Sequence, residues 1–356
     1  MAKFQTSWEN RLKLLRRLAW IFGVLALAAA AFVGWVMWPS GPKISPAAVA
    51  EPPPWEQPNT ATTYIPSIDP PSSPAGVVVD QDCDGGDAPA SAPEVNAASL
   101  TTAAWSPFGR PEIGWEIYAP RVASEIGTTC APSSRHFAAA LARWQQGHGL
   151  RPTGVLDPAT FQPMTTHWHL ARPFVRINAN GICPNAPPVS SLATARPNES
   201  YGGKVIQLRP GALEAYRNMV AEARAAGVVR RPEVLTLFSG FRDPDADAAR
   251  CARDNNCQGL VRTICSAHRT GLAMDLYIEA APGFGPDSSN DDNRRAMARS
   301  PVFRWMVVNA GRFGFVNYAF EPWHWEWTGE PLLPGVPISS LPQAGSQPVA
   351  PPAVKP

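Results

Sequence analysis

The 356-residue sequence predicts an α+β fold: a small antiparallel sheet with flanking helices, preceded by a membrane-span helix, a Pro-rich linker and a small three-helix domain. Helical and strand patterns are mixed after about residue 173, and the late strands have hairpin-scale spacing. A long apolar run and many of the 40 prolines precede this part. The net charge of +2 gives no nucleic-acid-binding signature, so we expect no nucleic-acid partner.

The uncharged run from Leu18 to Trp38 is long enough to span a hydrocarbon core of roughly 30 Å at about 1.5 Å per residue. Residues 1–38 are therefore predicted to be a cytoplasmic stub and a transmembrane signal anchor. Basic residues before the run predict a single-pass protein of the cytoplasmic (inner) membrane, with its C-terminal domains in the periplasm or another extracytoplasmic space: Lys3, Arg11, Lys13, Arg16 and Arg17. A cleaved signal peptide is the alternative.

Residues 39–104 are rich in Pro, Ala, Ser and Thr and have no sustained apolar period, which predicts a disordered linker. The Pro-rich tail, residues 331–356, is predicted to be disordered for the same reason. The stretch from Asp80 to Gly85 imitates the start of a calcium loop. Its twelfth position is Ser91 rather than Glu, which favours a solvated acidic linker.

Residues 105–172 predict a compact helical domain. Helical patterns run through Trp115–Ile126 and from a Ser133 or Ser134 cap to Trp144, and a short helix begins at Asp157. The run ALARWQQGHGLRPTGVLDPATFQPM resembles the three-helix peptidoglycan-binding domain, although Trp-Gln stands where Phe-Gln is usual. The resemblance implies wall binding, and a helical spacer without a ligand is the alternative. His167 and His169 could chelate a metal, but no third ligand is obvious nearby.

Six cysteines follow the apolar run, on the predicted outer side, where disulfides persist. Fifteen full pairings are possible and the sequence does not choose among them. Cys251 and Cys257 are close enough in sequence to be candidates, and a bridge at Cys265 could brace the loop of His268.

Residues 173–330 predict the α+β domain itself. An amphipathic helix opens with a proline and ends before Gly227, and a second helix opens at Ser300-Pro301 and stops before Gly311. Strand patterns lie between and after these helices. The predicted elements are the helix Pro210–Ala223 and the strands Val234–Ser239, Leu272–Ile278 and Val316–Phe320, the last leading into EPWHWEW.

The stretch SAHRTGLAMDLYI puts a carboxylate inside an apolar strand pattern. Alternation places Ala273, Asp275 and Tyr277 on one face, and the aliphatic residues on the other, buried face. Asp275 then points toward His268 from the preceding turn. The sequence contains no HExxH helix and no GxSxG elbow, and its only Ser-x-x-Lys, from Ser40, lies in the linker. Hydrolysis would therefore need a metal, and a catalytic zinc takes three protein ligands and a water.

The third ligand is predicted in EPWHWEW. After Pro322, alternation puts His324 and Glu326 on one face of a strand and the tryptophans on the other. A backbone bent at Pro322 would let Glu321 reach a metal-bound water while His324 holds the metal. Glu326 is the next candidate for the base. An aromatic-rich core strand with exposed carboxylates is the alternative interpretation of this segment.

Three motifs together resemble the zinc D-alanyl-D-alanine carboxypeptidases of the VanY type, which have the LAS metallopeptidase fold. They are the SxH(x)6D pattern in SAHRTGLAMD, the ExxH pattern in EPWH, and SGFR at Ser239–Arg242. The resemblance implies zinc ligands His268, Asp275 and His324, the base Glu321, a substrate or oxyanion contact from Arg242, and a substrate-carboxylate contact from Ser266. The Asp- and Cys-rich segment after SGFR departs from the pattern and leaves the peptide-length preference open.

These patterns predict a membrane-anchored zinc carboxypeptidase that removes the terminal D-alanine from peptidoglycan stem peptides. Zinc would lower the pKa of its bound water to about 7, and Glu321 would take the proton. The expected partners are peptidoglycan and its stem peptides, and the membrane through residues 18–38. A peptidoglycan endopeptidase of the same fold and a non-catalytic wall-binding protein are the alternatives. Oligomeric state is not predicted.

Overall fold

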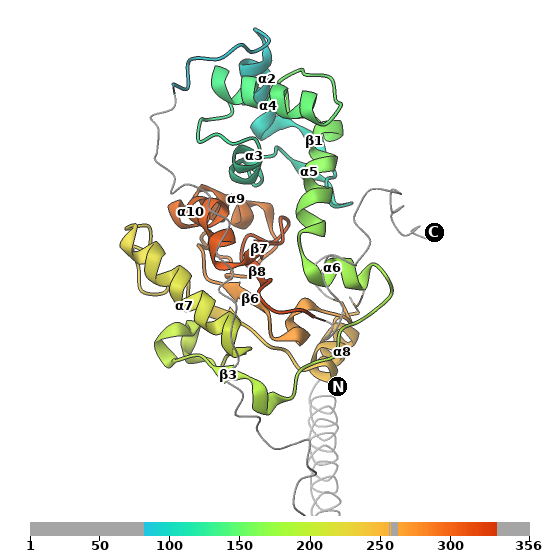
Figure 1. Ribbon diagram of the computed structural model, residues 1–356, viewed down its shortest axis with the longest axis vertical. Coiled ribbons are helices and arrows are strands. Elements are labelled where there is room, and N and C mark those ends of the chain that lie inside the picture. The colour runs from blue at the N-terminus through green and yellow to red at the C-terminus, as the bar shows by residue number, and fades with distance from the viewer. Residues whose placement is uncertain (1–81, 256, 258–262, 333–356) are drawn as a thin grey trace, which may run out of the picture. The chain divides into compact units, whose positions relative to one another are not determined.

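The computed structural model describes residues 82–255, 257 and 263–332, which belong to one compact unit. Figure 1 shows two regions within it. The helical region, residues 82–172, contains α2 to α5, and the sheet region, residues 173–332, contains the main sheet. The predicted signal anchor, the linker up to residue 81 and the tail from residue 333 lie outside the described residues.

The predicted single-pass membrane location is corrected by the structure. Within the described ranges, no helix is both long and apolar enough to cross a bilayer. The longest described helix, α7 (Pro210–Ala225), has 16 residues and is amphipathic. It would cover about 24 Å, less than a hydrocarbon core. The predicted span, residues 18–38, lies outside the described residues, and membrane association is not supported.

The helical region packs around the aromatic side chains of Trp115, Tyr118, Phe137 and Phe161. Side chains cap the two longest helices: Ser134 accepts from Phe137 N, and Asp157 accepts from Thr160 N. The elements of this region are α2 (Ala92–Thr102), β1 (Ala104–Trp105), β2 (Glu112–Ile113), α3 (Ala119–Glu125), α4 (Arg135–Gly147) and α5 (Pro158–Leu170).

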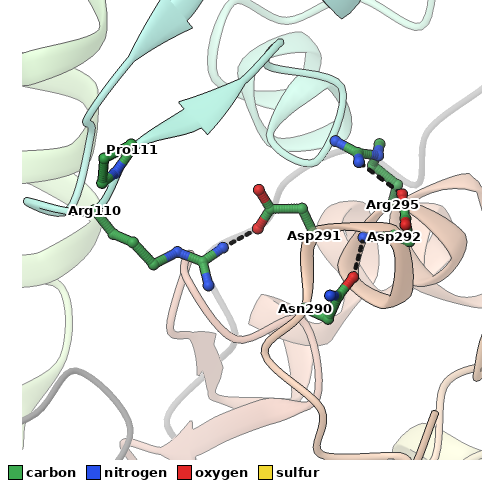
Figure 2. Close-up of a pocket in the computed structure, with 6 residues that line it drawn as sticks. All are labelled: Arg110, Pro111, Asn290, Asp291, Asp292 and Arg295. Carbon is green, nitrogen blue, oxygen red and sulfur yellow. Dashed lines mark hydrogen bonds and ion pairs between the residues drawn. The ribbon is translucent and has the colours of Figure 1, made fainter.

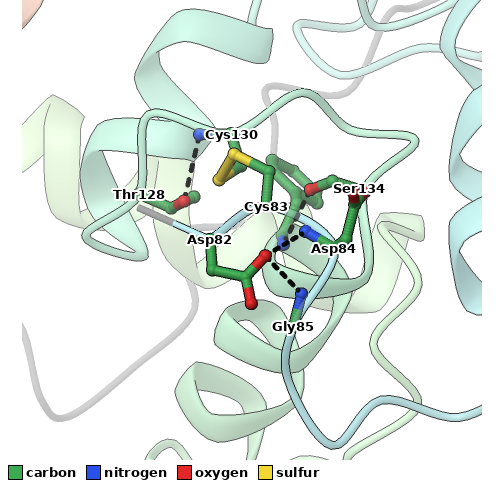
Figure 3. Close-up of a disulfide and its surroundings, with 8 residues drawn as sticks. Asp82, Cys83, Asp84, Gly85, Thr128, Cys130 and Ser134 are labelled. Atoms are coloured by element: carbon green, nitrogen blue, oxygen red, sulfur yellow. Dashed lines mark hydrogen bonds between the residues drawn. A yellow bond between two sulfur atoms is a disulfide. The ribbon is translucent and has the colours of Figure 1, made fainter. Parts of the chain in front are cut away.

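Helix α2 lies inside the segment predicted as a disordered linker. The buried Asn96 side chain explains its order: Nδ2 donates to Gly154 O at 2.8 Å, and Oδ1 accepts from Leu156 N at 3.0 Å. A disulfide joins Cys83 to Cys130 (Figure 3) and ties the start of this segment to the loop before α4. In the predicted acidic linker, Asp82 Oδ1 accepts from the backbone N–H groups of Asp84 and Gly85, a local turn.

The sheet region is built around a four-stranded antiparallel sheet of order β5-β6-β8-β7. Helices α7 and α10 cover one face, where Leu213, Phe303 and Met306 pack with Met274 and Trp325. The remaining elements are α6 (Pro173–Asn178), η1 (Val189–Ser191), β3 (Ala193–Thr194), η2 (Pro197–Glu199), η3 (Tyr201–Gly203), β4 (Gln207–Leu208), β5 (Leu237–Ser239), α8 (Pro244–Arg253), η4 (Ala267–Thr270), β6 (Ala273–Leu276), α9 (Asp291–Arg299), α10 (Pro301–Asn309), η5 (Ala310–Phe313), β7 (Phe315–Asn317) and β8 (His324–Trp327).

The predicted α+β class is confirmed, with two differences in the strands. Strand β5 starts at Leu237 rather than Val234, because Leu235 has a φ of 64° that breaks the extended run. Both faces of β6 are buried, not one. On the second face, Ala273 packs with Phe174 of α6 and with Ala267. The face of β6 that was predicted to be polar is therefore covered by other parts of the chain and encloses Asp275.

Two further disulfides join Cys183 to Cys265 and Cys251 to Cys257. The structure thus joins Cys251 and Cys257, which the sequence offered only as candidates. The bridge at Cys265 is also present, one residue before Ser266, and it links the loop of His268 to the chain after α6.

Candidate metal centre

The three predicted metal ligands come together where β6, β8 and η4 meet. Asp275 and His324 are direct cross-strand partners in the β6–β8 ladder. His268 lies in η4, which Ser266 caps by accepting from His268 N at 3.3 Å. The helix ends at Thr270 and is capped by Gly271, whose φ of 70° favours glycine, and the chain then enters β6. Local turn chemistry thus places His268 over the strand that carries Asp275.

The ligating atoms of His268, Asp275 and His324 all lie within 4.8 Å of one another, and all three residues are buried. His324 Nδ1 lies 2.9 Å from Asp275 Oδ1, and His268 Nε2 lies 3.2 Å from Asp275 Oδ2. Two imidazoles and one carboxylate therefore converge on one point from three segments.

The other nitrogen of each imidazole ring already has a polar partner within hydrogen-bond distance. His268 Nδ1 lies 2.7 Å from Gly240 O, and His324 Nε2 lies 3.1 Å from Glu326 Oε1. Gly240 is required here because a Cβ would meet Gln207 O at 2.6 Å. These contacts orient the rings and leave His268 Nε2 and His324 Nδ1 facing Asp275. Contacts of this kind commonly orient metal-bound histidines.

Buried negative charge dominates the centre. Burial opposes ionisation of Asp275, but His268 and His324 hold its pKa well below its usual range. Burial also opposes a charged Glu326, but Arg172 and His324 lower its pKa to about 2. Although burial opposes a charged His324, its hydrogen bonds to Asp275 and Glu326 raise its pKa to about 9. The carboxylates therefore draw a positive charge into this position.

The residues present fit a zinc ion. His268 Nε2 is buried, and although Asp275 Oδ2 lies 3.2 Å away, no described residue gives this nitrogen a well-directed hydrogen bond, which is costly for an imidazole nitrogen that lacks a ligand. Two imidazole nitrogens and a carboxylate oxygen form a donor set typical of catalytic zinc, which leaves a further position open. His167 and His169 are not in this group: His167 contacts Glu125, and His169 contacts Tyr318, whose ring also contacts His324.

Glu321 lies beside the three ligands, in the connection between β7 and β8. Its Oε2 is 4.0 Å from His324 Nδ1 and its side chain is buried. Burial raises the pKa of Glu321 to about 7, where a carboxylate can both accept and return a proton. The alternative base, Glu326, uses one oxygen, Oε1, to accept from Arg172 and to face His324 Nε2, so this carboxylate orients His324.

Arg242 and Ser266 lie at the edge of the centre. Arg242 Nη1 is 3.6 Å from Asp247 Oδ1 on α8, and its Nε is buried without a hydrogen bond to any described residue. Burial and the charge of Arg242 lower the pKa of His268. Ser266 is half-buried and its hydroxyl caps η4. Both side chains are therefore close to the predicted ligands.

Two residues at the centre were absent from the sequence prediction. Arg172 Nε donates to Glu326 Oε1 at 2.8 Å, and Asn317 Nδ2 donates to the carbonyls of Glu321 and His324 at 3.1 and 2.8 Å. Arg172 is 154 residues from Glu326, so no local pattern could pair them. Asn317 could have been noticed, because it is a polar residue in an otherwise apolar strand pattern.

Comparison with known proteins gives one family. Residues 205–330 match the family model VanY, described as D-alanyl-D-alanine carboxypeptidase. A structure titled "Structure of the LdcB LD-carboxypeptidase reveals the molecular basis of peptidoglycan recognition" is similar at 23% identity, covers 41% of this chain and 74% of that chain, and has a TM-score of 0.30. No curated protein matches the chain. The family match supports a peptidoglycan carboxypeptidase-type function for residues 205–330.

Proposed function

We propose that the chain is a zinc-dependent carboxypeptidase that removes the terminal D-alanine from peptidoglycan stem peptides. The observation that supports this proposal most directly is the buried group His268, Asp275 and His324 with Glu321 beside it. All four residues lie inside the part of the chain that matches the VanY family model.

When bound, zinc supplies a Lewis acid and lowers the pKa of a water ligand to about 7. Glu321 takes one proton from the attacking water as its oxygen adds to the last peptide carbonyl. Glu321 then returns that proton to the amine of D-alanine as the C–N bond breaks. Arg242 offsets negative charge that develops on the carbonyl oxygen. Ser266 is proposed to bind the terminal carboxylate of the substrate.

The helical region supports a second part of the proposal. The resemblance of residues 105–172 to peptidoglycan-binding domains leads us to propose that this region binds the wall, which would raise the local substrate concentration. A sedimentation assay with insoluble peptidoglycan tests this. Binding that persists in chelator, when turnover has stopped, is the expected result, and a protein that stays in the supernatant would contradict it.

One assay tests the proposed reaction. The full chain is incubated with soluble pentapeptide and with cross-linked wall fragments, with chelator and after zinc is restored, and the products are identified by mass. Loss of one terminal alanine supports the carboxypeptidase. Cleavage only inside the stem would show an endopeptidase of the same fold. Unchanged substrate in zinc-loaded samples would show a non-catalytic wall-binding protein.

A covalent penicillin probe tests the metal-dependent route separately. The described residues offer no serine activated by a neighbouring base, so the probe should leave the chain unlabelled. A labelled serine would show that the reaction uses a nucleophile rather than a metal.

A further inference from the structure

The catalytic segment, residues 317–326, carries both Glu321 and His324. Residues of the helical region contact this segment. Its middle part connects β7 to β8 through a turn, in which Glu321 N donates to Tyr318 O at 2.9 Å and His324 N donates to Glu321 O at 3.0 Å. Such connections are usually the mobile parts of a fold. Here Glu321 is nevertheless buried. The contacts that hold this segment therefore decide where the base stands.

The first contact is the arginine cluster, formed by Arg294, Glu112 and Tyr118. Arg294 is fully buried on α9, and its Nε donates to Phe320 O at 2.8 Å, one residue before Glu321. Its Nη1 donates to Glu112 Oε1 at 2.9 Å, and its Nη2 donates to the Tyr118 hydroxyl at 2.6 Å. That hydroxyl donates to Glu112 Oε2 at 2.7 Å. Burial raises the pKa of Tyr118, so its proton remains available for this bond.

The second contact is aromatic and polar. Phe108 of the helical region packs against Phe320 with ring centroids 5.4 Å apart, and against Tyr318 at 6.2 Å. Arg121 of α3 donates to Asn317 Oδ1 at 3.4 Å. Asn317 in turn holds the carbonyls of Glu321 and His324. The same helical surface therefore reaches the backbone on both sides of the base.

The third contact is Arg172, the last residue of the helical region. Two nitrogens of its guanidinium donate to Glu326 Oε1, and the same oxygen faces His324 Nε2. It also lies over the Tyr318 ring, 4.3 Å from the ring centroid. At the rim of the same interface, Arg110 pairs with Asp291 at the start of α9, as Figure 2 shows. Arg110 also lies over the Phe320 ring, 5.3 Å from the ring centroid, so this rim pair borders the catalytic segment.

We infer that the helical region holds the catalytic segment in its active position. The residues that act as positioning residues are Glu112, Tyr118, Arg121 and Arg172. This inference rests on the proposed function. It differs from wall binding in one measurable respect. A wall-binding module improves cleavage of insoluble wall only, whereas a positioning region is needed for turnover of a small soluble peptide as well. Catalytic groups displaced by about 1 Å lose on the order of 100-fold in rate.

Tyr118→Phe in the full chain tests the arginine cluster, because it removes only the hydroxyl that bridges Glu112 and Arg294. With soluble pentapeptide, kcat should fall about tenfold while KM stays within about twofold. Zinc affinity should be unchanged, because the cluster holds Glu321 and not a ligand. Hydrogen exchange in peptides covering 317–323 should rise. Arg299→Gln is the matched control, since it breaks the exposed Arg299–Glu116 pair between the same two regions.

Arg172→Gln tests the other end of the segment, and here zinc affinity should fall on the order of tenfold because Glu326 loses its partner. Arg172→Lys should restore part of that affinity. If Tyr118→Phe does not fold, Glu112→Gln replaces it with the same expectations. Wild-type kcat and wild-type exchange in the folded variants would overturn the inference. A wild-type protein without turnover would instead reject the proposed function, and exchange and zinc affinity would still decide the inference.

Discussion

Two buried charge clusters lie on either side of one peptide bond, and they differ in how completely their charges are paired. In the arginine cluster, all three guanidinium nitrogens of Arg294 donate to acceptors, and both oxygens of Glu112 are used. In the metal centre, His268 Nε2 lies 3.2 Å from Asp275 Oδ2 but makes no well-directed hydrogen bond with a described residue, and burial raises the pKa of Glu321 to about 7. The Phe320 carbonyl accepts from Arg294 of the first cluster, and the Glu321 side chain lies beside the second.

The difference separates a structural cluster from a functional one. A buried ion pair that satisfies every donor and acceptor leaves no position for a ligand. A cluster that combines a poorly hydrogen-bonded nitrogen with several buried carboxylates keeps a position for a cation. Burying these polar groups costs free energy until the cation binds. Both clusters are equally buried, so burial alone would not distinguish them. The distinction rests on the pairing of individual atoms.

Removing the metal should have the largest effect, and only on the incomplete cluster. Chelation should abolish turnover, and restoring zinc should recover it. The unfolding free energy should also rise with zinc, by about 2.7 kcal/mol when free zinc is 100 times its Kd. Calorimetry with and without chelator measures this. Equal stability in both samples would show that the centre needs no cation.

Glu321→Gln should have the next largest effect and separates catalysis from metal binding. Loss of the base should lower kcat by about 10²- to 10⁴-fold, while zinc content stays stoichiometric because Glu321 is not a ligand. The wild-type rate should rise with pH as Glu321 ionises. Its pKa of about 7 refers to the metal-free site, and a bound cation moves this limb to lower pH. A Gln variant with near-wild-type turnover would remove Glu321 from the reaction.

Arg294→Met tests the complete cluster. It leaves Glu112 buried without its cation, so the unfolding free energy should fall by about 3 to 5 kcal/mol. Arg299→Gln, which removes an exposed pair between the same regions, should change it by no more than about 1 kcal/mol. Denaturant titration of the zinc-loaded proteins measures both. Equal losses would mean that burial does not set the strength of these pairs.

The disulfides allow a comparison within the sheet region. Cys183 and Cys265 are separated by 82 residues, whereas Cys251 and Cys257 are separated by 6. Replacing the first pair by alanine should lower stability by about 2 to 4 kcal/mol, and the second by less, because the longer loop loses more entropy when it is closed. Thermal unfolding of the two double variants provides the measurement. The reverse order would show that local packing outweighs loop length.

Two of the three proposed metal ligands, Asp275 and His324, could be placed together from sequence because a strand alternates with period two. Asp275 and His324 each stand on the polar face of their own strand, and antiparallel pairing sets them opposite each other. Arg172 could not be predicted, since its partner Glu326 lies 154 residues away and any arginine nearby has the same local pattern. Helix α2 was missed for a related reason. Its order depends on Asn96 contacting residues 154 and 156, while the segment around it, residues 39–104, has the Pro-, Ala-, Ser- and Thr-rich composition of a linker.

Ser266→Ala should have the smallest effect and decides between two uses of one hydroxyl. As the cap of η4, Ser266 accepts from His268 N, and its loss should lower stability by about 1 kcal/mol. If the hydroxyl also binds the terminal carboxylate of the substrate, KM for soluble pentapeptide should rise while zinc affinity is unchanged. Ser266→Thr keeps both functions and is the control. A variant that loses stability but keeps the wild-type KM would assign Ser266 to the fold alone, beside a metal centre that it does not serve directly.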